Sequence, residues 1–207
     1  SLCGGDTTFS NKLSFTVTSL GYSKKIIYRN KALINDDIYV TGNLGDSFMG
    51  LQILKNRIKV SKKLENYFVK KYYLPNIQLK FTNKLLNVAN SSIDLSDGLI
   101  DDLGKMINNQ NLSFSLDIKK IPISNNLIKI IKMKTMKKIK LVSNGDDYQI
   151  LFTASSDKSR IIAQTSKNLG IKISKIGKIC SNKKRSVIID KKGNEIVLKN
   201  KGYFHQF

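Results

Sequence analysis

The fold is decided by residues 91–103, SSIDLSDGLIDDL, where a short apolar strand pattern runs through a turn directly into a helix pattern. Side chains alternate along a strand, so Asp94 and Ser96 are expected on one face. Ser96 or Asp97 is expected to cap the following helix. Such a junction places carboxylate oxygens, which hold Mg²⁺, beside a helix N-terminus, which favours phosphate. These residues also fit a simpler interpretation, a capped helix after a strand with Asp94 merely solvated.

Strand and helix patterns alternate along the rest of the chain. Apolar patterns predict strands over 13–22, 93–95, 113–118, 148–153 and 171–179, and a turn into a short strand over 35–42. Apolar residues three or four positions apart predict helices over 46–58, 62–73, 76–90, 98–107, 122–132 and 158–169. Residues 187–190 and 195–198 are expected to form a hairpin across 191–194. The mixture predicts an α/β fold of the layered α+β kind.

Composition places the chain among ordinary globular proteins. Its 207 residues, 41% of them hydrophobic, can bury a core. No apolar run approaches the roughly 18–20 residues that cross a bilayer, so no membrane partner is expected. Cys3 and Cys180 are isolated and lack the spacing of a metal site or a redox pair, which suits a reducing cytoplasm.

The net charge of +21 invites a nucleic-acid interpretation, which the pattern of the charges does not favour. The 36 basic residues are almost all lysines, scattered along a chain that is also rich in Asn and Ile. This combination indicates a coding bias rather than a basic groove, because arginine is the residue expected for bidentate phosphate and base contacts. No specific nucleic-acid partner is expected. The densest basic run, 132–140, is interpreted as a solvated helix face or loop.

Together with 91–103, four other segments form a set of motifs in a recognisable order along the chain. They are GGDTT at 4–8, DDIYVTGNLGDS at 36–47, SNGDDYQILF at 143–152 and GYFHQF at 202–207. The set resembles the thiamine-monophosphate kinase family, in the superfamily of aminoimidazole ribonucleotide synthetase and selenophosphate synthetase. Each motif alone is weak, but five in order are specific for the superfamily. The last two favour the kinase.

The resemblance implies a fold and a division of the chain. Residues 26–207 would form the C-terminal α/β domain of the aminoimidazole ribonucleotide synthetase-like fold, with a mixed sheet and packed helices. Residues 1–25 would be the final segment of an N-terminal ATP-binding domain. Family members carry more of that domain before GGDTT and pair through it as homodimers, with ATP at the junction. We therefore expect this chain to be a C-terminal portion that is inactive alone.

The resemblance also implies a reaction, the transfer of a phosphoryl group from ATP to thiamine monophosphate to give thiamine diphosphate. Mg²⁺ would be the cofactor and ATP the co-substrate, because two anionic phosphates must meet. The acceptor phosphate is already ionised near neutral pH. A general base is therefore unnecessary, and no catalytic residue is assigned.

Site residues follow from matching each position to the family's motifs. The expected ATP contacts are Gly5, Asp6, Arg29 and Ser96, the expected metal ligands are Asp6, Asp94 and Asp97, and the expected substrate contacts are Asp146 and Tyr203. Tyr203 would pack on a cationic ring of the substrate, since an aromatic face attracts a cation.

Simpler interpretations stand beside several of these assignments. The pattern around Arg29 has drifted, so a surface arginine fits equally well, and Tyr203 could dock on the core. Asp147 and Tyr148 are expected to hold the turn and core, and Gly42–Asp46 to start a helix. Asp102 is either a packing or hydrogen-bonding residue or a ligand. Two rival functions remain, another ATP-dependent member of the superfamily and a non-catalytic basic binding module.

Overall fold

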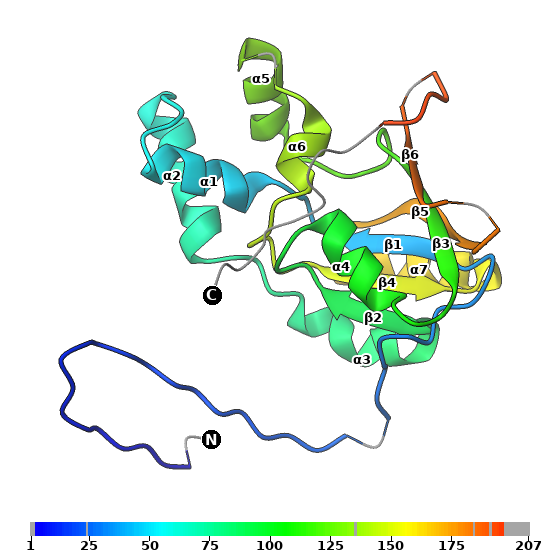
Figure 1. Ribbon diagram of the computed structural model, residues 1–207, viewed down its shortest axis with the longest axis horizontal. Helices are drawn as coiled ribbons and strands as arrows, with labels where there is room; N and C mark the ends of the chain where they lie inside the picture. The colour runs from blue at the N-terminus through cyan, green and yellow to red at the C-terminus, as the bar shows by residue number, and fades with distance from the viewer. Residues whose placement is uncertain (1–2, 24, 135, 184, 191, 197–207) are drawn as a thin grey trace.

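A six-stranded mixed sheet forms the centre of the molecule. The computed structural model describes residues 3–23, 25–134, 136–183, 185–190 and 192–196 (Figure 1). The strand order is β2-β4-β1-β5-β3-β6, and every pair is antiparallel except β3–β6. The strands are β1 (Asp37–Thr41), β2 (Ser91–Asp94), β3 (Leu112–Asp117), β4 (Ile150–Ala154), β5 (Ile173–Ser181) and β6 (Val187–Ile189).

Helices cover both faces of the sheet and form a separate group at one end of it (Figure 1). They are α1 (Asp46–Leu54), α2 (Lys62–Tyr73), α3 (Leu79–Val88), α4 (Leu99–Met106), α5 (Asn125–Lys134), α6 (Lys138–Val142) and α7 (Ser159–Leu169), with a 3₁₀ turn at Ser156–Lys158. This architecture confirms the predicted α/β class with a mixed sheet and packed helices.

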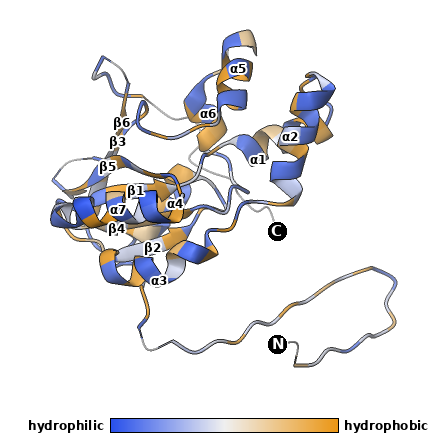
Figure 2. Cartoon of the chain, turned by 180° about the vertical axis from the view of Figure 1, so that it is seen from behind, coloured by the Kyte–Doolittle hydropathy of each residue, from blue (hydrophilic) through white to orange (hydrophobic). Residues whose placement is uncertain are grey.

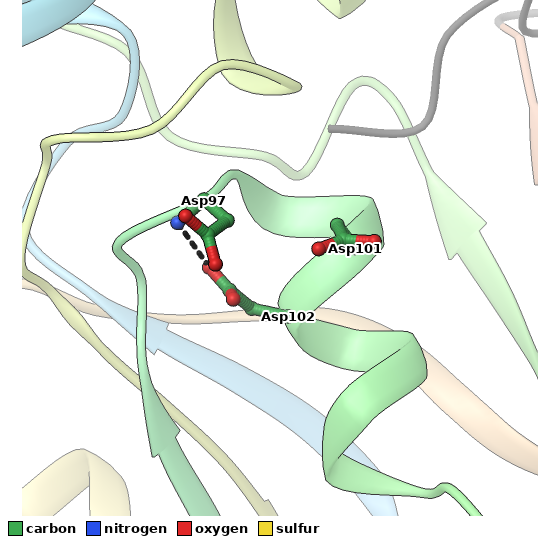
Figure 3. A group of neighbouring side chains, drawn as sticks. All are labelled: Asp97, Asp101 and Asp102. Carbon is green, nitrogen blue, oxygen red and sulfur yellow. Dashed lines mark hydrogen bonds between the residues drawn. The ribbon is translucent and has the colours of Figure 1, made fainter. Parts of the chain in front are cut away.

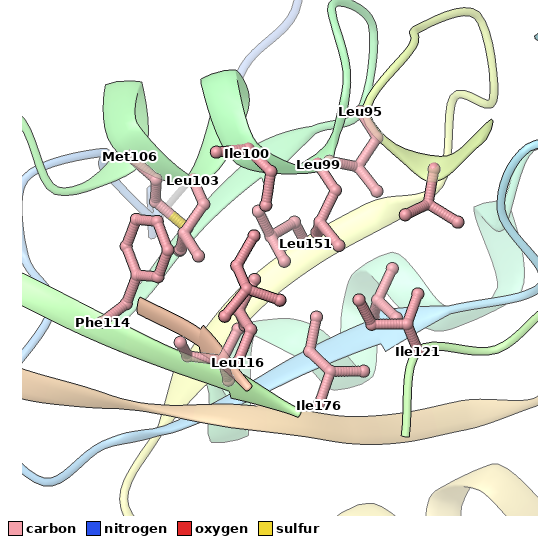
Figure 4. Packing of buried hydrophobic residues seen from close by; sticks show 14 of the residues in the cluster. Leu95, Leu99, Ile100, Leu103, Met106, Phe114, Leu116, Ile121, Leu151 and Ile176 are labelled. Atoms are coloured by element: carbon pink, nitrogen blue, oxygen red, sulfur yellow. The ribbon is translucent and has the colours of Figure 1, made fainter. Parts of the chain in front are cut away.

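Three apolar cores hold these layers together. The first packs α4 on one face of the sheet, where Leu99, Leu103 and Met106 meet strand residues such as Leu116 and Leu151 (Figure 4). A second core packs α3 and α7 on the opposite face, and a third joins α1, α2, α5 and α6. Because α4 is anchored along its apolar side, the turn before it has a fixed place at the edge of the sheet.

The N-terminal segment differs from its prediction. The strand predicted over 13–22 is wrong, because the structure assigns no strand there and every described side chain from Cys3 to Ser23 is exposed. Apolar residues recur along this segment, which stands clear of the folded part in both views (Figure 2). Alternation describes only the chain's own pattern, whereas a strand also needs a neighbour for its backbone hydrogen bonds.

Two further elements correct or extend the predictions. The run 132–140 was interpreted as a solvated helix face or loop, and residues 138–142 do form helix α6, but Ile139, Leu141 and Val142 are buried in it rather than solvated. The predicted hairpin is present where the structure describes it, through an antiparallel bridge between Ile189 and Glu195. Residues 197 and 198 lie outside the described residues. In the described part of the chain, no helix has the length and apolar character needed to span a membrane.

Candidate functional site

The candidate site lies where two loops meet at one edge of the sheet. One loop follows β2 and the other precedes β4, and these strands pair so that Asp94 lies opposite Ile150. The Asp146 N–H donates to the Ser96 carbonyl at 2.9 Å, and the Tyr148 N–H donates to the Leu95 carbonyl at 2.8 Å. Two motifs that are distant in the sequence are therefore joined by backbone hydrogen bonds.

Two glycines allow this close approach. A Cβ at Gly145 would lie 1.7 Å from the Ser96 carbonyl oxygen, closer than any side chain allows. Gly98 has a φ of 120°, and a Cβ there would lie 2.4 Å from the Ser143 carbonyl oxygen. Residues at these positions must therefore lack a side chain if the loops are to stay in contact.

The buried carboxylate of Asp102 accepts hydrogen bonds from the backbone of the first loop. Asp102 Oδ2 accepts hydrogen bonds from the N–H groups of Ser96, Asp97 and Gly98, each at 3.0 Å, and the residue is 1% exposed. The prediction that Ser96 or Asp97 caps α4 is wrong. Gly98 takes the cap position without a side-chain bond, and the carboxylate comes from within the helix. Burial raises the pKa of Asp102, against the opposing effect of the amides and Lys105.

An acidic group surrounds this turn (Figure 3). Asp97, Asp101 and Asp102 each offer a carboxylate oxygen, and these oxygens lie within 4.8 Å of one another. The Lys105 ammonium lies 2.5 Å from Asp97 Oδ2, 2.6 Å from Asp101 Oδ2 and 3.6 Å from Asp102 Oδ1. Lys105 and Asp101 are missed by the motif analysis, although their i,i+4 spacing on a helix is a recognisable signal.

Two more predicted carboxylates share this region. Burial and the charge of Asp97 raise the pKa of Asp146. Burial, followed by the charges of Asp146, Asp94 and Asp97, raises the pKa of Tyr148. Arg29 Nη2 lies 4.0 Å from Asp94 Oδ1, and both side chains are more than half exposed. The structure thus brings Arg29, Asp94, Asp97 and Asp146 together around the Ser96 turn.

The remaining predicted residues are not part of this group in the described structure. Gly5 and Asp6 lie on the exposed N-terminal segment, where the Asp6 carboxylate accepts a hydrogen bond from the Thr7 N–H at 2.8 Å. Tyr203 lies outside the described residues. The roles expected of all three stay predictions.

The second loop also organises the start of α1. Asp147 Oδ2 accepts the Gly45 N–H at 2.6 Å, and Oδ1 accepts the Ser47 N–H at 3.4 Å. Burial raises the pKa of Asp147 to about 8. The interpretation of Asp147 as a residue of the turn and core is confirmed, as is the helix start after Gly42. Tyr148 takes part in the turn through its backbone, but its side chain is 43% exposed rather than in the core.

Two cavities lie elsewhere in the described structure. One of about 640 Å³ lies between α4, β3 and β6, and another of about 700 Å³ follows β3. None of the predicted site residues that the structure describes lines either cavity. The chemistry of the carboxylates, rather than cavity size, therefore defines the candidate site.

The chain was compared with known proteins by sequence and by fold. No family model matches the chain. It is 35% identical over 207 residues to the thiamine-monophosphate kinase of Buchnera aphidicola subsp. Schizaphis graminum and 33% identical to that of Escherichia coli K12. Each alignment covers 99% of the chain and 63% of the relative, so the chain spans less than two thirds of these proteins.

Solved structures show the same fold. The thiamine-monophosphate kinase from Stenotrophomonas maltophilia has a TM-score of 0.71 at 24% identity, covering 84% of this chain and 55% of that one. AaThiL complexed with AMPPCP and TMP has a TM-score of 0.71 at 23% identity, covering 88% and 55%. HypE of E. coli has a TM-score of 0.62 at 12% identity, covering 84% and 52%.

The mixed sheet and its helices have the fold of the solved thiamine-monophosphate kinases and of HypE. In sequence, the chain is a homologue of the thiamine-monophosphate kinases and aligns with a portion of them.

Proposed function

We propose that this chain is part of a kinase that transfers the terminal phosphoryl group of ATP to thiamine monophosphate and yields thiamine diphosphate. The observation that carries the proposal is the meeting of Asp94, Ser96 and Asp97 with Asp146 at one pair of hydrogen-bonded loops. Relatives named for this activity align with 99% of the chain.

The donor chemistry of the site fits Mg²⁺. Carboxylate oxygens are the ligands that this cation prefers, and Asp97 belongs to a group whose oxygens lie within 4.8 Å of one another. In the proposal Asp94 and Asp97 hold the metal, together with Asp6. When bound, Mg²⁺ would neutralise the facing phosphates.

The chain's own residues would position the reactants rather than exchange protons. Ser96 and Arg29 would contact the ATP phosphates, together with Gly5. Asp146 would bind the cationic substrate, whose ring would also pack on Tyr203. Because the acceptor phosphate is already ionised, alignment in line with the leaving group is the main task of these residues.

We also propose that residues 1–25 belong to a separate N-terminal domain and residues 26–207 to the domain described above. Packing supports a boundary near residue 25, because Lys25 Nζ donates to the Leu86 carbonyl at 2.6 Å and Ile27 packs on the second core. Assembly of that other domain, in a homodimer, would bring Gly5 and Asp6 to the site. The 207-residue chain alone would then be inactive.

The test is thiamine diphosphate formation from ATP, Mg²⁺ and thiamine monophosphate. The product of the complete open reading frame is compared with the 207-residue chain. We expect activity in the longer product alone, and its loss in Asp97→Asn and Asp146→Asn variants of that product. Thiamine diphosphate formation by the chain alone would overturn the proposed dependence on another domain. Absence of product in both proteins would overturn the proposed reaction.

A further inference from the structure

Lys105 places a positive charge inside the acidic group that includes a proposed metal ligand. Its ammonium contacts Asp97 and Asp101 at hydrogen-bonding distance and lies within ion-pair range of Asp102. A lysine ammonium that contacts two carboxylates carries its full charge at neutral pH.

A divalent cation at Asp97 and this ammonium would compete for the same oxygen. Two cations a few ångströms apart repel, and the repulsion is stronger near a protein surface than in bulk water. Lys105 can move, because its side chain is 41% exposed and lysine has a long flexible stem. A metal at Asp97 is therefore compatible with the fold once Lys105 moves.

The neighbouring carboxylates determine which ion pair Lys105 can keep after it leaves Asp97. Asp102 cannot follow it, because Asp102 Oδ2 is held by three backbone amides. Asp101 lies one helical turn before Lys105 and is partly exposed, so it can keep the ion pair as Asp97 is released. The i,i+4 arrangement thus supplies a second partner for the displaced charge.

We propose that the Lys105 ammonium pairs with the Asp97 carboxylate in the metal-free protein and is displaced from it when Mg²⁺ binds. Lys105 thereby sets the metal affinity of the site. This inference rests on the proposed role of Asp97 as a metal ligand. Lys105 acts through Asp97 and is a positioning residue, not a catalytic one.

The experiment measures Mn²⁺ binding, by the loss of the free-ion signal in electron paramagnetic resonance, to the product of the complete open reading frame and its variants. Lys105→Met is expected to bind Mn²⁺ about tenfold more tightly, or better, because the competing charge is gone. Lys120→Met is the matched control. It removes the same charge from an exposed lysine whose ion pair with Asp117, at 3.7 Å, lies outside the site, and its affinity should not change.

Two further variants locate the effect. Asp97→Asn combined with Lys105→Met should abolish the gain, and Lys105→Gln should reproduce it, which guards against a folding defect specific to methionine. Unchanged or weaker Mn²⁺ binding by both Lys105 variants would overturn the inference. Thiamine diphosphate formation is followed separately: its failure beside a tenfold gain in affinity would reject the proposed reaction and leave the role of Lys105 standing.

Discussion

The Asp102 carboxylate accepts hydrogen bonds from backbone amides of its own chain. Its Oδ2 atom is shared by the N–H groups of three consecutive residues that form the turn after β2. One buried side chain thereby fixes the backbone that presents Ser96 and Asp97. The alternative of a hydrogen-bonding residue, which the sequence left open against a ligand, is confirmed for Oδ2.

Replacing this carboxylate should weaken the whole protein. Asp102→Ala leaves three amides without an acceptor, and each unsatisfied buried donor costs about 1–3 kcal/mol, so we expect a loss of about 3 kcal/mol in the free energy of unfolding. Asp102→Asn retains an acceptor oxygen and should lose about 1 kcal/mol. Urea denaturation measures both. Equal losses in the two variants would show that the amide contacts are not the cause.

The buried Asp147 should make stability depend on pH. Its pKa is raised from an ordinary 3.8 to about 8 in the folded protein. Between these values the folded state keeps a proton that the unfolded state has released, so the free energy of unfolding falls as pH rises. The stabilisation is complete below about pH 4 and is lost above about pH 8, with a slope of up to about 1.4 kcal/mol per pH unit.

Asp147→Asn removes this titration and should flatten the profile. Urea denaturation of both proteins at pH 5, 6.5 and 8 measures the difference. Asp102, which also has a raised pKa, adds to both profiles. Parallel profiles for the two proteins would contradict the assignment to Asp147.

The two site loops should respond as a pair to changes in either one. Gly145→Ala places a methyl group 1.7 Å from the Ser96 carbonyl oxygen, so the loops must separate. Overpacking of this kind typically costs about 1–3 kcal/mol, and we expect the upper part of that range together with loss of the proposed kinase activity in the complete protein.

Gly104→Ala is the matched control on α4, because a Cβ there meets no atom within 4 Å. Alanine in a helix is more favourable than glycine, so this variant should gain about 0.5–1 kcal/mol and keep its activity. The comparison requires only denaturation curves and the product assay. Similar destabilisation by both variants would point to a general intolerance of larger residues.

Which elements could be predicted depended on where their stabilising contacts lie. Helix α2 was predicted with its observed bounds because its own apolar spacing and Pro75 mark it. The burial of helix α6 was missed because its lysines dominate the local pattern, while Leu141 packs in the third core and Ile139 and Val142 pack in the first. The loop contact between Ser96 and Asp146 follows from the pairing of β2 with β4, which no local pattern contains.

The same limit applies to the site. Motif positions identified Asp94, Asp97 and Asp146, which the structure gathers, but they gave no signal for Lys105 as their neighbour. Gly5 and Asp6 carry a motif as clear as the others, yet their described surroundings are exposed. A motif identifies a candidate residue. Whether that residue reaches the site depends on the other segments that pack around it.

At the scale of the whole molecule, the proposed boundary near residue 25 can be tested. Deleting residues 1–23 should change the free energy of unfolding of the remaining domain by less than about 0.5 kcal/mol, as is usual for exposed residues. It should also reduce self-association, because Phe9, Leu13 and Phe15 are at least 85% exposed. Denaturation and sedimentation velocity measure the two effects. A large loss of stability would contradict the proposed boundary.

The internal pairing of backbone amides has a consequence for nucleotide recognition. Amides at the start of α1 already face Asp147, and those of the turn before α4 already face Asp102. Many phosphate sites offer such groups free, as a ready-made anion cradle. Here the amides of both turns already bond to a carboxyl group of the chain itself. A triphosphate that binds at this edge should therefore depend on divalent ions, and its affinity should collapse when they are chelated.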